Sequence, residues 1–189
     1  MAAVEATGRH TISVLVDNES GVLARVIGLF SGRGYNIESL TVSETEHAKH
    51  VSRITIVTTG TPQVIQQIKN QLDRMIPVHS VLDMTLFGNA IERELAMVKV
   101  RDLTIDGPSL ERELALVKVR GTGEKRVESL RIADIFRARV VDATIESFVF
   151  EMTGSTDKLN AFIGLMRPLG LVDVARTGVA AIARGPEPL

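Results

Sequence analysis

The stretch HTISVLVDNESGVLARVIGLFSGRGYNIESLTV, residues 10–42, sets the expected fold of the first half of the chain. His10–Val16 is rich in β-branched residues and predicts a strand, and the polar run DNESG at 17–21 predicts a turn after it. Apolar residues then recur at three- and four-residue spacing as far as Phe30, which predicts a helix, and Gly32 marks its end. The order strand, turn, helix, strand follows.

The same kind of pattern continues to residue 87. Two strands, 36–44 and 50–59, are expected to form a hairpin through the charged turn at 46–49. Thr61 can cap a second helix, and Pro62 suits its first turn. That helix is expected over 62–75 and a returning strand over 78–87, which completes the order β-α-β-β-α-β of a ferredoxin-like domain.

The second half of the chain repeats this order at similar length. We expect strands at 113–120, 139–145, 147–153 and 171–183, with helices at 124–138 and 157–169. Ser155, Thr156 and Asp157 offer capping oxygens for the last helix. The sequence therefore predicts an α+β protein with two tandem ferredoxin-like domains, residues 10–88 and 113–184, and a linker at 89–112.

A tandem repeat lies between the predicted domains. Residues 83–101 (DMTLFGNAIERELAMVKVR) recur as residues 102–120 (DLTIDGPSLERELALVKVR), with twelve of nineteen positions identical. The simplest origin is a duplication of this segment. The extra copy is expected to lengthen the linker or to add a hairpin, and a changed contact with a partner is the alternative.

Composition excludes several classes of function. The net charge of −1, a pI near 6.4 and 4% aromatic residues without tryptophan disfavour nucleic-acid binding. The absence of cysteine removes disulfides and thiolate chemistry and suits a reducing compartment. Because no run of 18 apolar residues occurs, we expect a soluble, cytoplasmic protein.

No arrangement of residues predicts catalysis or a metal site. The histidine pair of HAKH at 47–50 falls in a predicted solvated turn, and no cysteine or acidic cluster completes a metal shell. GTGEKR at 121–126 lacks the spacing of a nucleotide loop and reads as a turn into a helix. The charged strings IEREL (91–95) and LEREL (110–114) are interpreted as solvated approaches to strands rather than as acid pairs.

A stronger constellation is DNESGVL at 17–23 followed by RGYNIESL at 33–40. A helix start presents free backbone N–H groups and a positive dipole end, which suit the carboxylate of a small zwitterion. Asp17 or Asn18 could accept hydrogen bonds from an ammonium group, and Gly21 permits close approach. The remaining candidates are Asn36, as a bridge from the next strand, and Val22, Leu23 and Ile37, as an aliphatic wall. An ordinary capped helix explains the same residues equally well.

Long stretches of the chain resemble a known family. The stretch VLVDNESGVLARVIGLFSGRGYNIESLTV (14–42) is similar to the N-terminal ACT domain of the small, regulatory subunits of acetolactate synthase (acetohydroxyacid synthase). The stretches 111–142, SFVFEMTG (147–154) and VARTGVAAIARG (174–185) resemble the C-terminal domain of that family. The resemblance covers nearly the whole chain, and only the duplicated segment departs from it.

This resemblance implies a non-catalytic subunit that binds a catalytic large subunit, raises its activity and confers feedback inhibition by valine. Thiamine diphosphate, Mg²⁺ and FAD would belong to that large subunit, and this chain would carry no cofactor. The resemblance also implies a homodimer of ACT domains with effector sites between the two chains. Asn18 and Gly21 would hold the charged end of the effector, and Asn36 of the other chain would face them. Valine, leucine and isoleucine all remain open as the effector.

One reading from a different class is a free-standing amino-acid sensor of the ACT type that acts on another enzyme or on transcription. A transcriptional role would need a DNA-reading element, and the sequence shows no helix-turn-helix and no basic stripe. An enzyme built from ferredoxin-like domains is the second alternative, and no catalytic constellation favours it.

Overall fold

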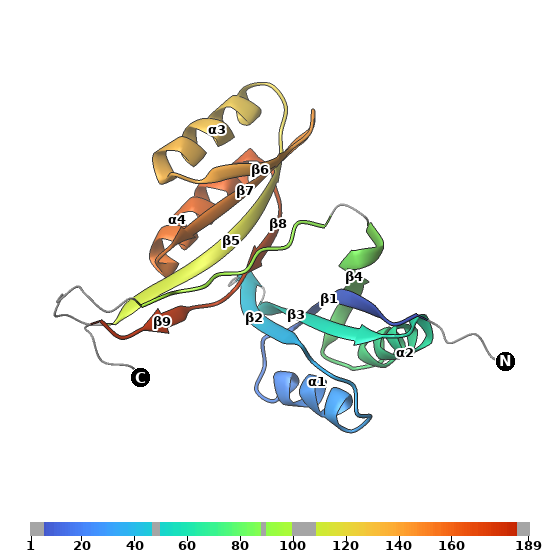
Figure 1. Cartoon of the computed structure of the whole chain (residues 1–189). Coiled ribbons are helices and arrows are strands. Elements are labelled where there is room, and N and C mark those ends of the chain that lie inside the picture. The colour runs from blue at the N-terminus through green and yellow to red at the C-terminus, as the bar shows by residue number, and fades with distance from the viewer. Residues whose placement is uncertain (1–5, 47–49, 88–89, 100–108, 185–189) are drawn as a thin grey trace. The chain divides into compact units, whose positions relative to one another are not determined.

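The computed structural model describes residues 6–46, 50–87, 90–99 and 109–184 (Figure 1). The chain divides into two compact units, Met1–Glu92 and Arg93–Leu189. Each unit consists of one antiparallel sheet with two helices. The predicted α+β class and the two ferredoxin-like domains in series are confirmed.

The first unit follows the order β1 (Gly8–Asp17), α1 (Val22–Ser31), β2 (Ser39–Glu46), β3 (Val51–Gly60), α2 (Pro62–Asp73) and β4 (Val78–Asp83). Its four strands lie in the order β2-β3-β1-β4. Gly8 pairs with Gly60 and Asp17 with Val51, while Ser39 pairs with Val57. Strands β2 and β4 are therefore the edges, and β1 and β2 run in the same direction.

One side of this sheet carries the core of the first unit. Alternate residues of β1 and β3 point to the same side because side chains alternate along a strand. There they pack against apolar residues that recur every three or four positions on α1 and α2. The cluster consists of Ile12, Val14, Val16, Val22, Val26, Phe30, Ile54, Ile56, Ile65, Ile68 and Leu72.

The second unit contains β5 (Leu110–Arg120), α3 (Glu124–Phe136), β6 (Arg139–Ala143), β7 (Ser147–Gly154), α4 (Thr156–Met166), β8 (Leu171–Arg176) and β9 (Ala180–Ile182). Its strands lie in the order β6-β7-β5-β8, and β9 pairs with the first residues of β5. The order of β5 to β8 matches the order of β1 to β4 in the first unit, as the repeated pattern predicts.

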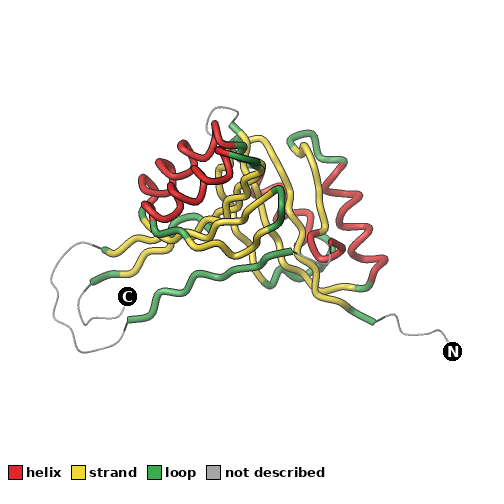
Figure 2. Tube along the Cα trace, turned by 90° about the horizontal axis from the view of Figure 1, so that it is seen from above, coloured by secondary structure: helices red, strands yellow, loops and turns green. Residues whose placement is uncertain are grey.

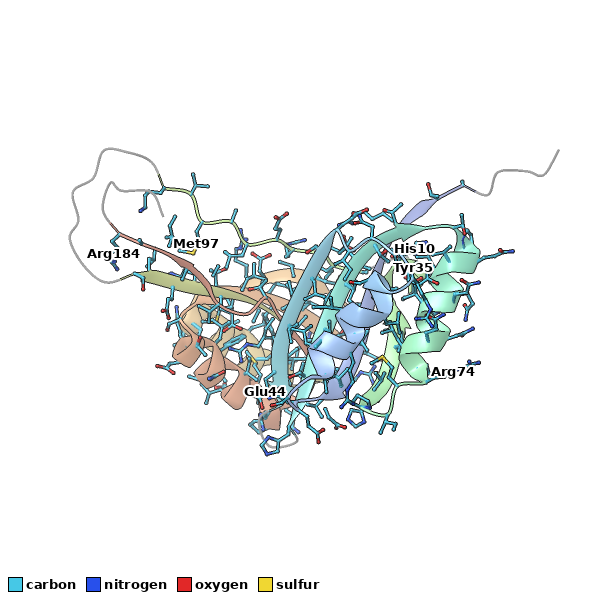
Figure 3. All side chains as sticks on the ribbon, turned by 90° about the horizontal axis from the view of Figure 1, so that it is seen from below. His10, Tyr35, Glu44, Arg74, Met97 and Arg184 are labelled. Carbon is cyan, nitrogen blue, oxygen red and sulfur yellow. The ribbon has the colours of Figure 1, made fainter. Side chains whose placement is uncertain are left out.

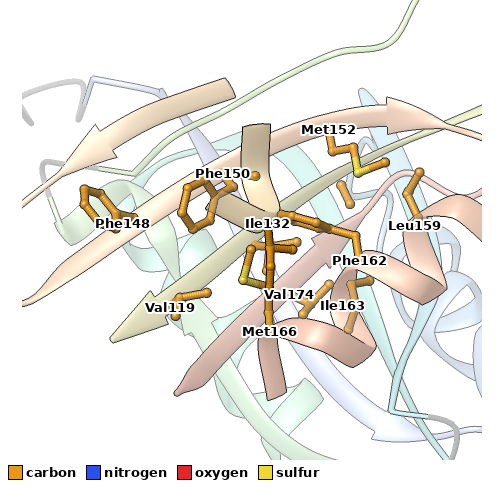
Figure 4. Packing of buried hydrophobic residues seen from close by; sticks show 13 residues of the cluster. Val119, Ile132, Phe148, Phe150, Met152, Leu159, Phe162, Ile163, Met166 and Val174 are labelled. Carbon is orange, nitrogen blue, oxygen red and sulfur yellow. The ribbon is translucent and has the colours of Figure 1, made fainter. Parts of the chain in front are cut away.

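The core of the second unit is built on the same plan and is richer in aromatic rings (Figure 4). Phe150 of β7 is fully buried, and its ring meets the edge of Phe162 from α4 with 6.1 Å between centroids. Ala115, Val117 and Val119 of β5 face the same cluster. An edge-to-face pair of this kind stabilises the core beyond the area that it buries.

Three predicted strands were too long, and one of them, expected at 139–145, ends at Ala143. The strand expected at 78–87 ends at Asp83, and a short 3₁₀ helix, η2 (Met84–Phe87), follows it. The strand expected at 171–183 is two strands, because Gly178 has φ 77° and breaks the ladder between β8 and β9. Strand β5 begins at Leu110 rather than at 113, and its added residues pair with β9.

The two copies of the repeat have different structures. In the second copy, residues 110–120 form β5, the central strand between β7 and β8. In the first copy, residues 90–99 are extended coil without regular secondary structure (Figure 2). The described part of the first copy therefore adds no hairpin strand, and residues 100–108 lie outside the described residues.

None of the helices in the described part of the chain is long and apolar enough to cross a membrane.

Candidate functional site

The turn between β1 and α1 is tied to two neighbouring loops of the first unit. The backbone N–H of Asp17 donates to the carbonyl of Pro77 at 2.9 Å, and that of Asn18 donates to the carbonyl of His50 at 2.6 Å. These bonds fix the end of β1 against the residues that directly precede β4 and β3. The side chain of Asn18 remains exposed and can meet a ligand.

Helix α1 begins without a side-chain cap. Gly21 precedes it with φ 86° and ψ −9°, a left-handed conformation that glycine adopts without strain, and no side chain accepts a hydrogen bond there. By contrast, Thr61 caps α2 by accepting from the Val64 N–H, as predicted. A side-chain cap is therefore not found at this position, and the Val22 N–H contacts the Glu19 carbonyl at 3.4 Å instead. The N–H groups of Leu23 and Ala24, which come next in the first turn, suit an anion.

Asp17 is already engaged by a residue that the sequence did not indicate. The Nε2 atom of His79 on β4 lies 2.7 Å from its Oδ1 atom, and both side chains are partly exposed. Sixty-two positions separate the two residues, so no local pattern could have predicted the pair. Of the two candidates for an ammonium group, Asn18 is thus the less encumbered.

The two aliphatic candidates on α1 have different environments. Val22 is 3% exposed and packs in the core of the first unit, and its place in an aliphatic wall stays a prediction. Leu23 is 37% exposed and Ile27, one helical turn further along, is 38% exposed. Leu23 and Ile27 therefore provide an exposed apolar surface beside the first turn of α1.

Asn36 and Ile37 lie at the other end of the first sheet. They precede β2, whose first residue Ser39 pairs with Val57, while the Asn36 carbonyl accepts from the Thr58 hydroxyl at 2.6 Å. In Figure 3, the labelled residues Tyr35 and His10 lie toward the end of the first sheet opposite to Glu44. Asn36 is exposed, whereas Ile37 is partly buried against the core.

The described arrangement therefore brings Asp17, Asn18, Gly21 and Leu23 together and leaves Asn36 apart from them. An eight-residue strand such as β2 spans roughly 25 Å, which is far beyond the reach of one amino-acid ligand. The candidate residues thus form two groups at opposite ends of the edge strand, and one small ligand cannot contact both groups within one chain.

The second unit contains a buried ion pair that corrects the reading of LEREL as solvated. Glu113 is 3% exposed, and its two oxygens accept from Nε and Nη2 of Arg176 at 2.8 and 2.6 Å. Asn160 accepts from Nη1 of the same arginine at 2.8 Å, and the Thr156 hydroxyl is 3.4 Å from Glu113. This fork satisfies both charges, which is the arrangement of a structural pair rather than of a catalytic acid.

A second buried carboxylate lies on the face of the second sheet away from its helices. Glu151 of β7 is 6% exposed and accepts hydrogen bonds from Arg139 of β6 and, at 2.7 Å, from Arg93. The Arg139 bond, with help from Arg93, outweighs burial and holds the pKa of Glu151 below its ordinary value of 4.5. Arg93 belongs to the first copy of the repeat, so this copy contacts the second sheet.

Glu92, the neighbouring residue, makes its contacts in the first unit. Its carboxylate accepts from the Thr11 hydroxyl at 2.5 Å and from Nη1 of Arg9 at 3.2 Å. The Thr11 bond and then the Arg9 contacts lower the pKa of Glu92, and together they outweigh the opposing effect of burial. In IEREL, Glu92 therefore pairs within the first unit and Arg93 pairs within the second unit.

The described residues contain no group of three or more His, Cys, Asp or Glu side chains that could hold a metal ion. His47 of the HAKH sequence lies outside them. Residues 121–123 form the turn between β5 and α3, with Gly123 at φ 58°, as the reading of GTGEKR as a turn predicts.

Two family models match the chain, one on each unit. The model described as the AHAS small subunit-like ACT domain matches residues 12–80. The model described as the small subunit of acetolactate synthase matches residues 112–185. Both fall on the domains that the fold defines.

Similar proteins match along almost the whole chain. A probable acetolactate synthase small subunit of Archaeoglobus fulgidus is 45% identical over 177 residues, which are 94% of this chain and 98% of the relative. The acetolactate synthase small subunit of Aquifex aeolicus is 45% identical over 93% of this chain and 81% of its own length. The crystal structure of the small subunit from Thermotoga maritima is 33% identical and covers 94% of this chain, with a TM-score of 0.41.

Proposed function

Because this chain belongs to the family of acetolactate synthase small subunits, we propose that it activates a catalytic large subunit and makes it sensitive to feedback inhibition by valine. The support is that the family match extends over both domains rather than over the ACT domain alone. The match of residues 112–185 to the small-subunit model is not accounted for by a free-standing ACT-type sensor.

We propose that valine binds where the open first turn of α1 in one chain meets Asn36 of a second chain. Strand β2 is an edge strand, and a two-fold axis beside it would place a second β2 antiparallel to the first. That operation moves the Asn36 end of one chain next to the Asn18 end of the other. The opposite-end placement of the two groups of residues is the observation that carries this site, and a dimer would hold two such sites.

Each group of the effector has a counterpart in this site. The N–H groups of Leu23 and Ala24 and the positive end of α1 suit the carboxylate, and the side-chain oxygens of Asn18 and Asn36 suit the ammonium group. Leu23 and Ile27 supply the apolar surface for the isopropyl group. Valine and leucine differ by one methylene, which is worth about 1–3 kcal/mol in a closed pocket, so selectivity should be modest.

Regulation follows from differential binding. A ligand held between two chains stabilises the dimer arrangement that closes the site, and the holoenzyme shifts toward the state which contains that arrangement. We propose that this state is the less active one. Thiamine diphosphate, Mg²⁺ and FAD are proposed to act in the large subunit, and no step is assigned to them on this chain.

Reconstitution tests the regulatory function. The purified chain is mixed with the acetolactate synthase large subunit of the same organism, and acetolactate formation from pyruvate is measured with and without valine. We expect the chain alone to be inactive, the large subunit to gain activity on mixing, and valine to reduce that gain. Activity that neither rises on mixing nor falls with valine would contradict the proposal.

Complementation between two variants tests the shared site. Asn18→Ala and Asn36→Ala should each abolish valine binding, measured by calorimetry. Asn70→Ala, on the exposed side of α2, is the matched control and should leave valine binding unchanged. In mixed dimers one site carries both changes and the other carries neither. Co-expression should therefore restore about a quarter of the sites if chains pair at random. No restoration, or full binding by either single variant, would rule out a site that the chains share.

A further inference from the structure

The two copies of the repeat are identical at every position that β5 buries. In the second copy the buried residues of β5 are Glu113, Leu114, Ala115, Val117 and Val119. The same residue types occupy the matching positions of the first copy, which are 94, 95, 96, 98 and 100. Between 91–99 and 110–118 the differences are Ile91 for Leu110 and Met97 for Leu116, and neither of the β5 residues is fully buried.

In the first copy, Glu94, Ala96 and Val98 are exposed and Leu95 is partly buried. Val98 is 81% exposed, whereas its counterpart Val117 is fully buried between β7, β8 and the helices. Glu94 is exposed, whereas its counterpart Glu113 forms the buried fork with Arg176. Residues 91–99 therefore lie outside the sheet, although they carry the residue types that face the core in the central strand of the same chain.

We infer that the two copies are interchangeable as the central strand of the second domain. Residues 91–99 can enter between β7 and β8 in the register that 110–118 now hold, because each inward side chain finds the same partner. Val98 would meet Phe150, and Glu94 would meet Arg176. Since both copies belong to one chain, the exchange needs no second molecule and the local concentration of the spare strand is high.

Two features of the fold favour the second copy in the unmodified chain. It is followed directly by the turn at 121–123, where a Cβ on Gly121 would lie 3.2 Å from the Leu169 carbonyl oxygen. The first copy is followed by Asp102 at the matching position. Second, Arg93 of the first copy donates a hydrogen bond to Glu151, and this bond would be lost if the first copy entered the sheet. A longer loop between strand and α3 would oppose the exchange weakly, because closure entropy grows slowly with loop length.

The exchange would change the length of chain between the two sheets. With the second copy in the sheet, residues 84–109 connect β4 to the central strand and can extend to roughly 90 Å. With the first copy in the sheet, residues 84–90 connect them and can extend to roughly 25 Å. The exchange would thus shorten the connection between the two domains by one repeat unit.

A pair of deletions tests whether either copy is sufficient. One variant lacks residues 83–101, and the other lacks residues 102–120, so that Arg101 joins Gly121. Both should keep a cooperatively folded second domain, with slow hydrogen exchange in the one remaining strand. Loss of that domain in the second deletion alone would overturn the inference.

Point variants of the full chain test the exchange itself. Val117→Asp should move hydrogen-exchange protection from 110–118 to 91–99, because an aspartate cannot occupy the core position. Val98→Asp is the matched control and should leave protection on 110–118. The double variant should lose protection in both segments. If Val117→Asp lost protection on 110–118 without a gain on 91–99, or matched the double variant, the copies would not be interchangeable.

Discussion

At the scale of single residues, Gly21 controls how the chain enters helix α1. Its φ of 86° is accessible to glycine but strained by about 1–2 kcal/mol for alanine, and a Cβ there would meet no atom within 4 Å. Gly21→Ala should therefore destabilise the first domain by about that amount through the backbone alone.

Gly28 provides the opposite control on the same helix. It lies inside α1, and a Cβ added there would point into open space, so Gly28→Ala should stabilise the domain by about 0.5–1 kcal/mol. Tyr35 is the single tyrosine of the chain and packs on Phe30 of α1, so its fluorescence during urea unfolding reports on this domain. Changes of the same sign in both variants would contradict the assignment.

Arg176 is expected to matter because removing it leaves a buried charge. Arg176→Ala would leave the Glu113 carboxylate, at 4% side-chain exposure, buried without its charge partner. The free energy of unfolding should fall by about 3–5 kcal/mol. Arg131, which pairs with Glu128 at 72% exposure, is the control, and Arg131→Ala should cost less than about 1 kcal/mol. Urea unfolding followed by circular dichroism measures both, and equal losses would show that the fork contributes little.

The sequence could not reveal this pair, and the reason is physical. LEREL alternates charges as an exposed strand end does, and the burial of Glu113 depends on an arginine 63 positions away. The same holds for His79 beside Asp17. The role of Gly21 at the start of α1 could be predicted, because conformational freedom is a property of glycine itself.

At the scale of elements, helix starts divide into capped and uncapped ones. Thr61 on α2 and Ser155 on α4 each accept a first-turn N–H at 3.4 Å, a long bond, so replacing either with alanine should cost about 0.5–1 kcal/mol. Ser20→Ala before the uncapped α1 should cost nothing measurable. Thermal unfolding of the three variants compares them, and a comparable loss in Ser20→Ala would reveal a cap on α1.

Helices and strands followed the apolar periodicity of the sequence closely, because the buried faces that produce the periodicity also determine the elements. The ends were harder to predict. The run after Leu171 has strand composition as far as 183, yet Thr177 bonds Leu114 through its backbone N–H and side chain and turns the chain toward β9. The pairing of β9 depends on the added residues Leu110–Arg112 of β5, which the local pattern does not indicate.

At the scale of the whole molecule, acid should weaken the second domain through Glu151. Its pKa is lowered in the folded state, so its ionised form stabilises the domain above the unfolded value of 4.5, and this stabilisation is lost as the pH falls through the lower folded value. Glu151→Gln should be less stable at pH 7 and lose less stability between pH 5 and acid than the unmodified chain. Urea midpoints across that range measure the difference, and parallel curves would contradict it.

The two-domain organisation was predictable because the order of elements occurs twice in the sequence. The candidate site was predictable only in part. The pattern indicates the α1 turn and Asn36, but their separation along β2 depends on strand register, and the burial of Val22 depends on how α1 packs against the sheet. Asn18 and Asn36 are only 18 positions apart in the sequence, yet they lie at opposite ends of the first sheet.

The repeat unit ends at Arg120, which is also the last residue of β5. The first copy begins at Asp83, the last residue of β4, and removal of that copy places Asp102, the same residue type, directly after Leu82. Removal of the second copy likewise leaves Arg101, the same residue type as Arg120, directly before Gly121. The loss of either unit therefore keeps the residue types at both junctions and changes the length of chain between β4 and α3.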